Sequence, residues 1–285
     1  MNAGILPVRH RKGKNMKIRE VIEKILEYHP VLPKETIIDR VLAGDPEQEC
    51  TGIVTTCCCS VEVIRKAAEL GANLIIPHEP LFWTHQGFTD WIEDSDVYQE
   101  KLKLLNENGI VVFRDHDHIH YHRPDGIRYG VMQELGWTKY CQTDLMTRER
   151  TRLSFKLPPT PLREIVSLFK EKLGLEYVRV VGNTEAVIEN VVFCGHIEFN
   201  NETAATSILK EDGVDLLIPG EMIDWTAANF ARDAAQLGKN KAILHLGHFN
   251  SEELGMKYAA NWVVDLTDHK VPVTFVPSAD IYHYL

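Results

Sequence analysis

The chain has 285 residues, 44% of them hydrophobic and 25% charged, which is ordinary for a globular protein with one large core or two medium-sized ones. Acidic residues outnumber basic residues by 41 to 31, and the net charge of −10 disfavours nucleic acid as a partner. No apolar run approaches the roughly 20 residues needed to cross a bilayer, so we expect no membrane span.

The cysteines and the first fifteen residues indicate the cellular compartment in which we expect the protein. Three of the six cysteines are consecutive, at 57 to 59, and no CxxC pair occurs, so we expect a reducing, cytoplasmic environment and small buried thiols. Residues 1–15 are basic and lack the apolar stretch of a signal peptide. We expect them to form a leader or a disordered tail, and a nucleic-acid-binding arm is the alternative.

Helices and strands alternate in the first half of the chain. Apolar residues at helical spacing predict a first helix over 18–28, which Pro30 and Pro33 end. Ser60 is a typical N-cap for a helix that stops at Gly71. The alternation indicates parallel βαβ units. The other predicted elements here are strands over 51–57, 74–76 and 110–113 and helices over 61–70, 97–106 and 126–135.

Three prolines between residues 158 and 161 mark a connection to a second half with the same alternation. Its predicted elements are helices over 162–173, 226–237 and 251–264 and strands over 178–181, 187–194, 214–218, 242–246 and 271–275. We therefore predict an α/β fold with two related lobes, 16–144 and 145–285, within one continuous domain.

An internal repeat supports the relation between the lobes. Residues 71–83 align with residues 213–225, and Gly, Leu, Ile, Pro, Glu and Trp recur at the same six places. Polar side chains follow the strands of both copies, so we expect them to meet in a shared cleft, where open α/β sheets bind ligands. The paired Trp83 and Trp225 are expected in the core or at the lobe interface.

Three segments carry residues that bind metals. His78 and Glu79 stand between two prolines. Four of the thirteen histidines fall between residues 116 and 122, and we expect His118 and His122 to point away from a shared site. His248 and Glu252 have the spacing of four that places both on one side of a helix start, with Ser251 as its cap.

Imidazole and carboxylate ligands together suit zinc, iron, manganese or nickel. The absence of cysteine from these segments favours an open site that retains water over a closed structural zinc site. Glu221 matches Glu79 in the repeat, and it either belongs to this site or complements the dipole of a helix N-terminus.

At these residues the chain resembles the NIF-three-like family (the Ngg1-interacting-factor-three proteins), from about Met16 onward. The family's His-His-Pro-Leu turn is similar to residues 78–81, and its Ala-His-Thr-Asn-x-Asp turn to residues 115–120. Its Gly-His-Tyr-x-x-Glu motif is similar to residues 247–252, and its Gly-Glu after a strand to residues 220–221. Members are known as dinuclear metal centre proteins or GTP cyclohydrolase 1 type 2 homologues.

The resemblance implies a two-lobed fold with a metal-binding cleft between the lobes, a homohexamer, and a short form without the inserted domain of longer members. It implies one or two divalent ions per chain. Two family ligands differ, since Glu79 replaces a histidine and His120 replaces an aspartate that bridges both metals. The implied ligands are His78, Glu79, His116, His120, His248 and Glu252.

Two functions follow from this site. The first is a metal-dependent hydrolase for a small molecule or a nucleotide, with Glu79 or Glu221 as general base. Opening the purine ring of GTP is one option, although no Walker-type loop is present to hold a triphosphate. The second is a metal-binding regulatory or interaction protein without turnover, which the changes at Glu79 and His120 favour. A metal-free scaffold is a third reading.

Overall fold

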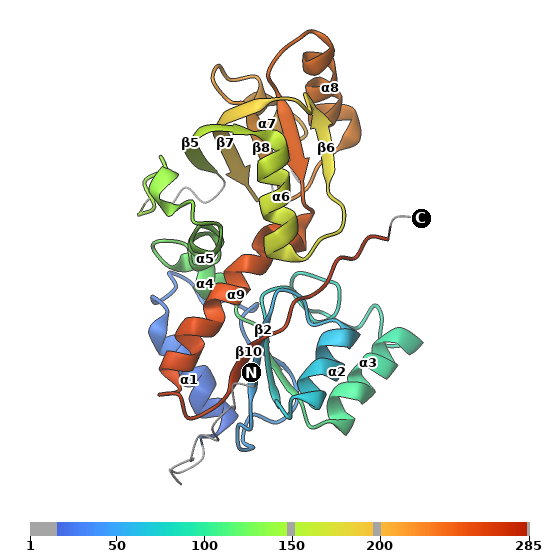
Figure 1. Ribbon diagram of the computed structural model, residues 1–285. Helices are drawn as coiled ribbons and strands as arrows, with labels where there is room; N and C mark the ends of the chain where they lie inside the picture. The colour runs from blue at the N-terminus through green and yellow to red at the C-terminus, as the bar shows by residue number, and fades with distance from the viewer. Residues whose placement is uncertain (1–15, 147–151, 196–200, 284–285) are drawn as a thin grey trace, which may run out of the picture.

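The computed structural model describes residues 16–146, 152–195 and 201–283, so the expectations for residues 1–15 lie outside the described residues. Two five-stranded sheets lie one above the other in Figure 1, each with helices on both faces. In both sheets the inner strands run parallel. The predicted α/β fold with two lobes is confirmed.

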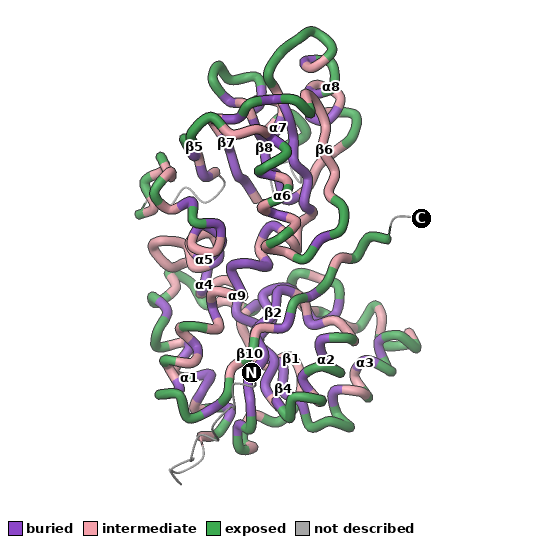
Figure 2. The backbone as a smooth tube through the Cα atoms, viewed as in Figure 1, coloured by how far each residue is buried: buried purple, intermediate pink, exposed green. Residues whose placement is uncertain are grey.

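The first sheet has the strand order β1-β4-β3-β2-β10, with β1 antiparallel to β4. Its inner strands are apolar on both faces, because helices cover both sides, and Figure 2 shows them as buried. The strands are β1 (Val41–Ala43), β2 (Ile53–Thr56), β3 (Leu74–Pro77), β4 (Val111–Phe113) and β10 (Val273–Phe275). The helices are α1 (Ile18–Tyr28), α2 (Val61–Glu69), α3 (Asp96–Glu107), α4 (Asp117–Tyr121) and α5 (Gly126–Leu135).

The second sheet has the order β5-β7-β8-β9-β6, with antiparallel edge strands on both sides. Its strands are β5 (Leu153–Pro161), β6 (Arg179–Gly182), β7 (Val187–Cys194), β8 (Leu216–Pro219) and β9 (Ala242–His245). Its helices are a 3-10 turn (Thr138–Tyr140), α6 (Leu162–Leu173), α7 (Ala204–Leu209), a π-helical turn (Asp224–Ala228), α8 (Asn229–Gln236) and α9 (His248–Leu266).

Helix α9 joins the two lobes, and Figure 1 shows it running from the end of β9 down to α1. Its Leu254 packs in the core of the upper sheet, whereas Met256, Ala259 and Val263 pack with α1 in the core of the lower sheet. The chain then returns through β10, which pairs with β2. The lobe boundary near residue 145 stays a prediction, but the last strand lies in the sheet of the first half.

Local chemistry explains several helix ends. The hydroxyl of Ser60 accepts a hydrogen bond from the Val63 amide at 3.2 Å, so the predicted N-cap is confirmed. The prediction that Ser251 caps the last helix is wrong, because α9 begins at His248 and the buried Ser251 hydroxyl donates to the His248 carbonyl instead.

The predicted burial of two tryptophans is also wrong. Trp83 is 48% exposed and Trp225 is 68% exposed. Both follow a strand at the point where the chain turns outward, Trp83 with a φ of 54° and Trp225 in the π-helical turn. Of the consecutive cysteines, Cys57 and Cys59 are buried as expected, and Cys58 is half-buried.

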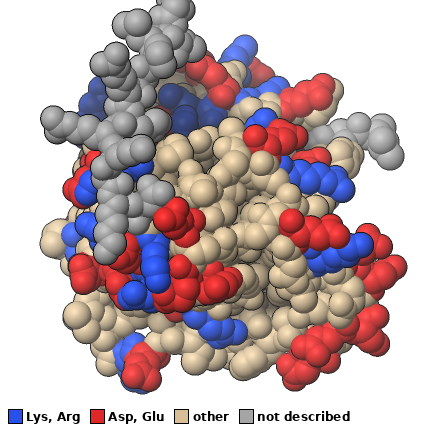
Figure 3. Space-filling model, turned by 90° about the horizontal axis from the view of Figure 1, so that it is seen from below, with Lys and Arg blue, Asp and Glu red and all other residues tan. Residues whose placement is uncertain are grey.

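The surface charge and the helices of the described residues relate to the expectations about nucleic acid and membrane. On the face seen in Figure 3, acidic and basic side chains surround a central area that contains few charged residues, and acidic side chains predominate along the lower right edge. None of the helices within the described ranges is long and apolar enough to cross a membrane.

Candidate metal centre

Three chain segments bring nitrogen and oxygen ligands together at the carboxyl ends of parallel strands. His78 and Glu79 follow β3, His116 and His120 follow β4, and His248 follows β9. Such strand ends are where open α/β sheets hold ligands. In the sequence these residues are up to 170 positions apart (248 − 78), so it is the fold that brings them together.

Three histidines form the first candidate group. One ring nitrogen from each of His78, His116 and His120 lies within 4.8 Å of the others. Their ring centroids are 4.6 to 4.9 Å apart, with His78 stacked on His116 and His120 edge-on to both. Three imidazoles at this spacing can hold one divalent ion.

Each of these histidines is oriented through its Nδ1 atom. His78 Nδ1 lies 3.1 Å from the Asp115 carbonyl oxygen, and His120 Nδ1 lies 2.8 Å from Asp125 Oδ2. His116 Nδ1 lies 2.9 Å from Asp117 Oδ1. Oxygen partners on Nδ1 fix the tautomer and leave Nε2 as the ligand atom, as in metal sites generally.

A second candidate group consists of His78, Glu79 and Glu252. His78 Nε2 is 3.4 Å from Glu252 Oε2. Burial opposes protonation of His78, yet the charge of Glu252 raises its pKa above the usual value. The negative charge that favours a proton on His78 equally favours a metal cation in its place.

The neighbouring pKa values also suit metal binding. Burial together with the charge of His78 lowers the pKa of His116 to about 3, so its imidazole is neutral at neutral pH. Burial works against ionisation of Glu79, but the hydrogen bond from His248 and the charge of His78 lower its pKa to about 2. Neutral imidazole and ionised carboxylate are the ligating forms.

His248 lies between carboxylates from three segments. Its Nε2 is 2.7 Å from Glu79 Oε1 and 3.2 Å from Glu252 Oε2, and its Nδ1 is 2.7 Å from Glu221 Oε1. Burial opposes a proton on His248, but these carboxylates raise its pKa far above the usual value. His248 therefore links the ligand groups to Glu221, and its predicted role as a ligand stays a prediction.

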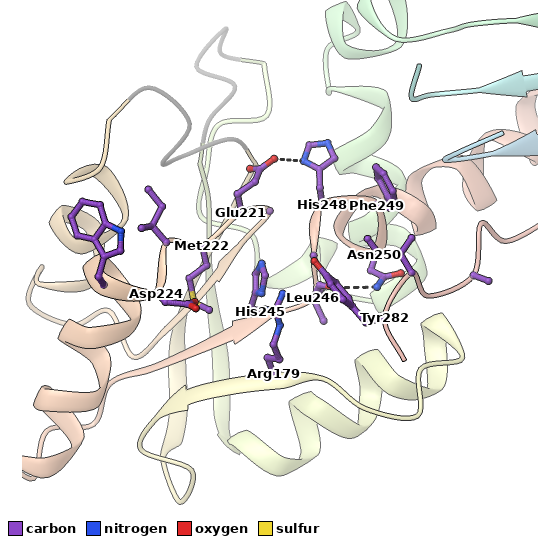
Figure 4. Close-up of a pocket in the computed structure, with 16 residues that line it drawn as sticks. Arg179, Glu221, Met222, Asp224, His245, Leu246, His248, Phe249, Asn250 and Tyr282 are labelled. Atoms are coloured by element: carbon purple, nitrogen blue, oxygen red, sulfur yellow. Dashed lines mark hydrogen bonds and ion pairs between the residues drawn. The ribbon is translucent and has the colours of Figure 1, made fainter. Parts of the chain in front are cut away.

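A cavity of about 570 Å³ opens beside His248 and Glu221. Its walls come from β6, the turn after β8, the end of β9, the first turn of α9 and the C-terminal segment 279–282. In Figure 4 the Glu221 and His248 side chains meet at one edge of this cavity, joined by a dashed line. This volume is within the usual range for small-molecule sites.

Sequence reasoning missed two residues that support the site. Asp39 has a fully buried side chain that accepts hydrogen bonds from the amides of His116, Asp117 and His118 at 3.0, 2.9 and 2.7 Å. Arg114 is also buried, and its Nη2 lies 3.5 Å from Glu79 Oε2. Neither stands in a recognisable motif, so only the tertiary contacts identify them.

The other histidines of the segment 116–122 behave differently. His118 Nδ1 pairs with Asp39 Oδ2 at 2.7 Å, and the His122 ring packs on His29 and Tyr28. Within the described ranges, neither belongs to a group of three potential ligands. His85, which the sequence did not single out, forms such a group with His116 and Asp117.

Comparisons with known proteins place the fold. The chain is 29% identical over 256 residues to a GTP cyclohydrolase 1 type 2 homolog from Clostridium perfringens, covering 83% of this chain and 87% of that protein. A protein of the same name from Clostridium acetobutylicum is 24% identical over 247 residues, covering 84% and 86%.

Solved structures show the same fold. A Staphylococcus aureus hypothetical protein superposes with a TM-score of 0.68 at 18% identity, covering 95% of this chain and all (100%) of that one. Reduced HcgD from Methanocaldococcus jannaschii superposes with a TM-score of 0.64 at 17% identity, covering 92% and 98%. The family model described as Duf34/NIF3 (NGG1p interacting factor 3) matches residues 16–280. The chain therefore belongs to the Duf34/NIF3 family.

Proposed function

We propose that this protein is a metal-dependent hydrolase of a small molecule. The observation that carries the proposal is the convergence of His78, His116 and His120, with Glu252 Oε2 3.4 Å from His78 Nε2. This group lies next to a cavity that His248 and Glu221 line. A ligand cluster beside an open cavity lets an ion and a substrate meet, whereas a structural metal site is closed.

The residues present fit a bound ion. His78 Nε2 and Glu252 Oε2 are both buried and lie 3.4 Å apart, and His248 Nε2 lies 3.2 Å from the same Glu252 oxygen. An ion held by both atoms would be bound by one imidazole nitrogen and one carboxylate oxygen that already lie close together in a buried place. The set of imidazole and carboxylate donors suits zinc, iron, manganese or nickel.

We propose that one ion per chain binds first, at the three histidines with Glu252. His78 offers a single free nitrogen, so it cannot serve both candidate groups at once. A second ion would depend on Glu79, Glu252 and His248, and Glu79 and His248 already contact each other at 2.7 Å.

When bound, the ion would supply Lewis acidity, which lowers the pKa of a bound water toward about 7. The protein side chains orient one another toward the cavity and accept the proton. Glu79 and Glu221 hold the His248 imidazole from opposite sides, so its orientation toward the cavity is fixed. Either carboxylate can accept the proton of the attacking water, and Glu221 is the one that lines the cavity.

The test combines elemental analysis with an activity panel on freshly purified protein. The panel includes nucleotides, phosphoesters and cyclic amides, with GTP among them because two relatives bear a GTP cyclohydrolase name. We expect about one metal per chain and turnover that His120→Ala removes together with the metal. His122→Ala is the matched control, since His122 lies in the same segment and belongs to no ligand group. Full activity in a metal-free His120→Ala protein would refute the proposal.

A non-catalytic metal-binding protein is the second candidate. It is favoured by Glu79, which replaces a family histidine and is engaged by both Arg114 and His248. Metal-loaded protein without turnover on any member of the panel, and with metal-dependent association with a partner, would select this candidate. We also propose a homohexamer, for which light scattering would give six times the chain mass of 32.5 kDa.

A further inference from the structure

The cavity beside His248 has a distinctive lining. Figure 4 shows Glu221, Met222 and Asp224 on one side and Phe249, Asn250 and Tyr282 on the other, with His245 and Arg179 between them. The lining thus combines several apolar or aromatic side chains with one guanidinium and two carboxylates.

Two large aromatic side chains of this lining are exposed to solvent. Trp225 is 68% exposed and Tyr282 is 45% exposed, and Ile281, which precedes Tyr282 in the chain, is 60% exposed. Exposed aromatic rings that face a cavity provide flat apolar surfaces, and a planar ligand ring that covers them is stabilised by the hydrophobic effect and by stacking. The cavity is therefore suited to a planar ring.

Among the described residues that line this cavity, Arg179 is the one that carries a permanent positive charge. Its guanidinium carbon lies 5.0 Å from the centroid of the Tyr282 ring, and no carboxylate of the described residues lies within ion-pair distance of it. The planar fork of a guanidinium matches a carboxylate in a two-point contact, and stacking on a ring holds the fork in place. A half-buried arginine that forms no ion pair with the part of the chain that the structure describes is therefore suited to a ligand anion.

The charge of the lining limits how much negative charge the bound anion can carry. Arg179 is opposed by Glu221 and Asp224, and no lysine is found among the described residues that line the cavity. Burial and the neighbouring Arg179 lower the pKa of His245, so its imidazole adds no positive charge at neutral pH. A triphosphate carries several negative charges that this lining does not balance, whereas a single carboxylate needs one cation only.

We propose that the cavity binds an aromatic or heteroaromatic ring that bears one carboxylate. The carboxylate pairs with Arg179, the ring lies against Tyr282, and the remaining end of the molecule faces Glu221 and His248. That this molecule is the substrate rests on the proposed function. That it binds in the cavity does not, because binding needs neither turnover nor an ion.

The test measures binding of matched acid and amide pairs by calorimetry on the full-length, metal-loaded protein. The probes are nicotinate with nicotinamide, and indole-3-carboxylate with its amide, and GTP is the polyphosphate comparison. We expect at least one acid to bind about tenfold more tightly than its amide, and more tightly than GTP. Arg179→Met should abolish this preference, and Arg179→Lys should keep part of it because the charge remains without the fork.

Arg163→Met is the matched control, since Arg163 lies on the same lobe, is exposed and pairs with Glu185. Equal affinity for every acid and its amide, a preference that survives Arg179→Met, or GTP as the tightest ligand would each overturn the inference. Binding is repeated after chelation. Acid binding that persists in a protein without hydrolytic activity would leave the inference standing while the proposed function fails.

Discussion

Asp39 should control both the stability of the protein and its affinity for metal. Its Oδ1 accepts hydrogen bonds from the amides of His116 and Asp117, and its Oδ2 accepts from the amide and the ring of His118. In Asp39→Asn one of the two oxygens becomes an NH₂ group that faces donors, so two of these four bonds are lost. A hydrogen bond to a charged group contributes about 1.5–3 kcal/mol, so the loss should be about 3 kcal/mol or more.

The same bonds hold the backbone that carries His116 and His120. Loss of groups that orient metal ligands typically weakens metal binding by about 10–100-fold. Urea denaturation measures the free energy of unfolding, and competition with a chromogenic chelator measures metal affinity. Asp45→Asn is the control, because its side chain accepts one bond in an exposed turn, from the Glu47 amide at 2.9 Å. A loss below about 1 kcal/mol with unchanged metal affinity would refute this reasoning.

Three further predictions concern packing, capping and thiols. Gly255→Ala should lower stability by about 1–3 kcal/mol in thermal unfolding, since the added Cβ would lie 2.7 Å from the Ile127 carbonyl oxygen at the contact of α9 with α5; an unchanged melting temperature would contradict it. Ser60→Ala should cost about 1 kcal/mol through loss of the N-cap, whereas Ser60→Asp should retain most of the stability. Burial raises the pKa of the Cys50 and Cys59 thiols to about 12, so both should resist a disulfide reagent at pH 8 until the protein unfolds; rapid labelling of either in the native protein, identified by mass spectrometry, would oppose this assignment.

Elements with a strong local pattern were predictable from the sequence. The helical spacing of Ile18, Val21, Ile22 and Ile25 gave α1 with its observed bounds, because these side chains fill one side of the core. The short β-branched runs of β2 and β3 were equally clear, since a strand covered on both faces is apolar throughout.

Features that no local sequence pattern marks were not predictable. The start of α9 follows from Gly247, whose φ of 89° lets the chain turn from β9 into the helix three residues before the expected cap. The repeat correctly related the two lobes. That a tryptophan recurs at positions 83 and 225 did not indicate burial, because both side chains are exposed. Asp39 acts on residues 77 to 79 positions later, so no local pattern marks it.

The arrangement of α9 has a consequence for biosynthesis. The three histidines of the first group leave the ribosome within the first 120 residues, but Glu252 lies on α9, near the end of the chain. Until α9 and β10 have been synthesised, the lower sheet lacks Met256, Ala259 and Val263 from its core and β10 from its edge. An ion captured early would therefore sit on an incomplete sheet with fewer ligands. If the proposed ion binds with Glu252 as a ligand, full metal affinity would therefore require that α9 has docked on the lower sheet.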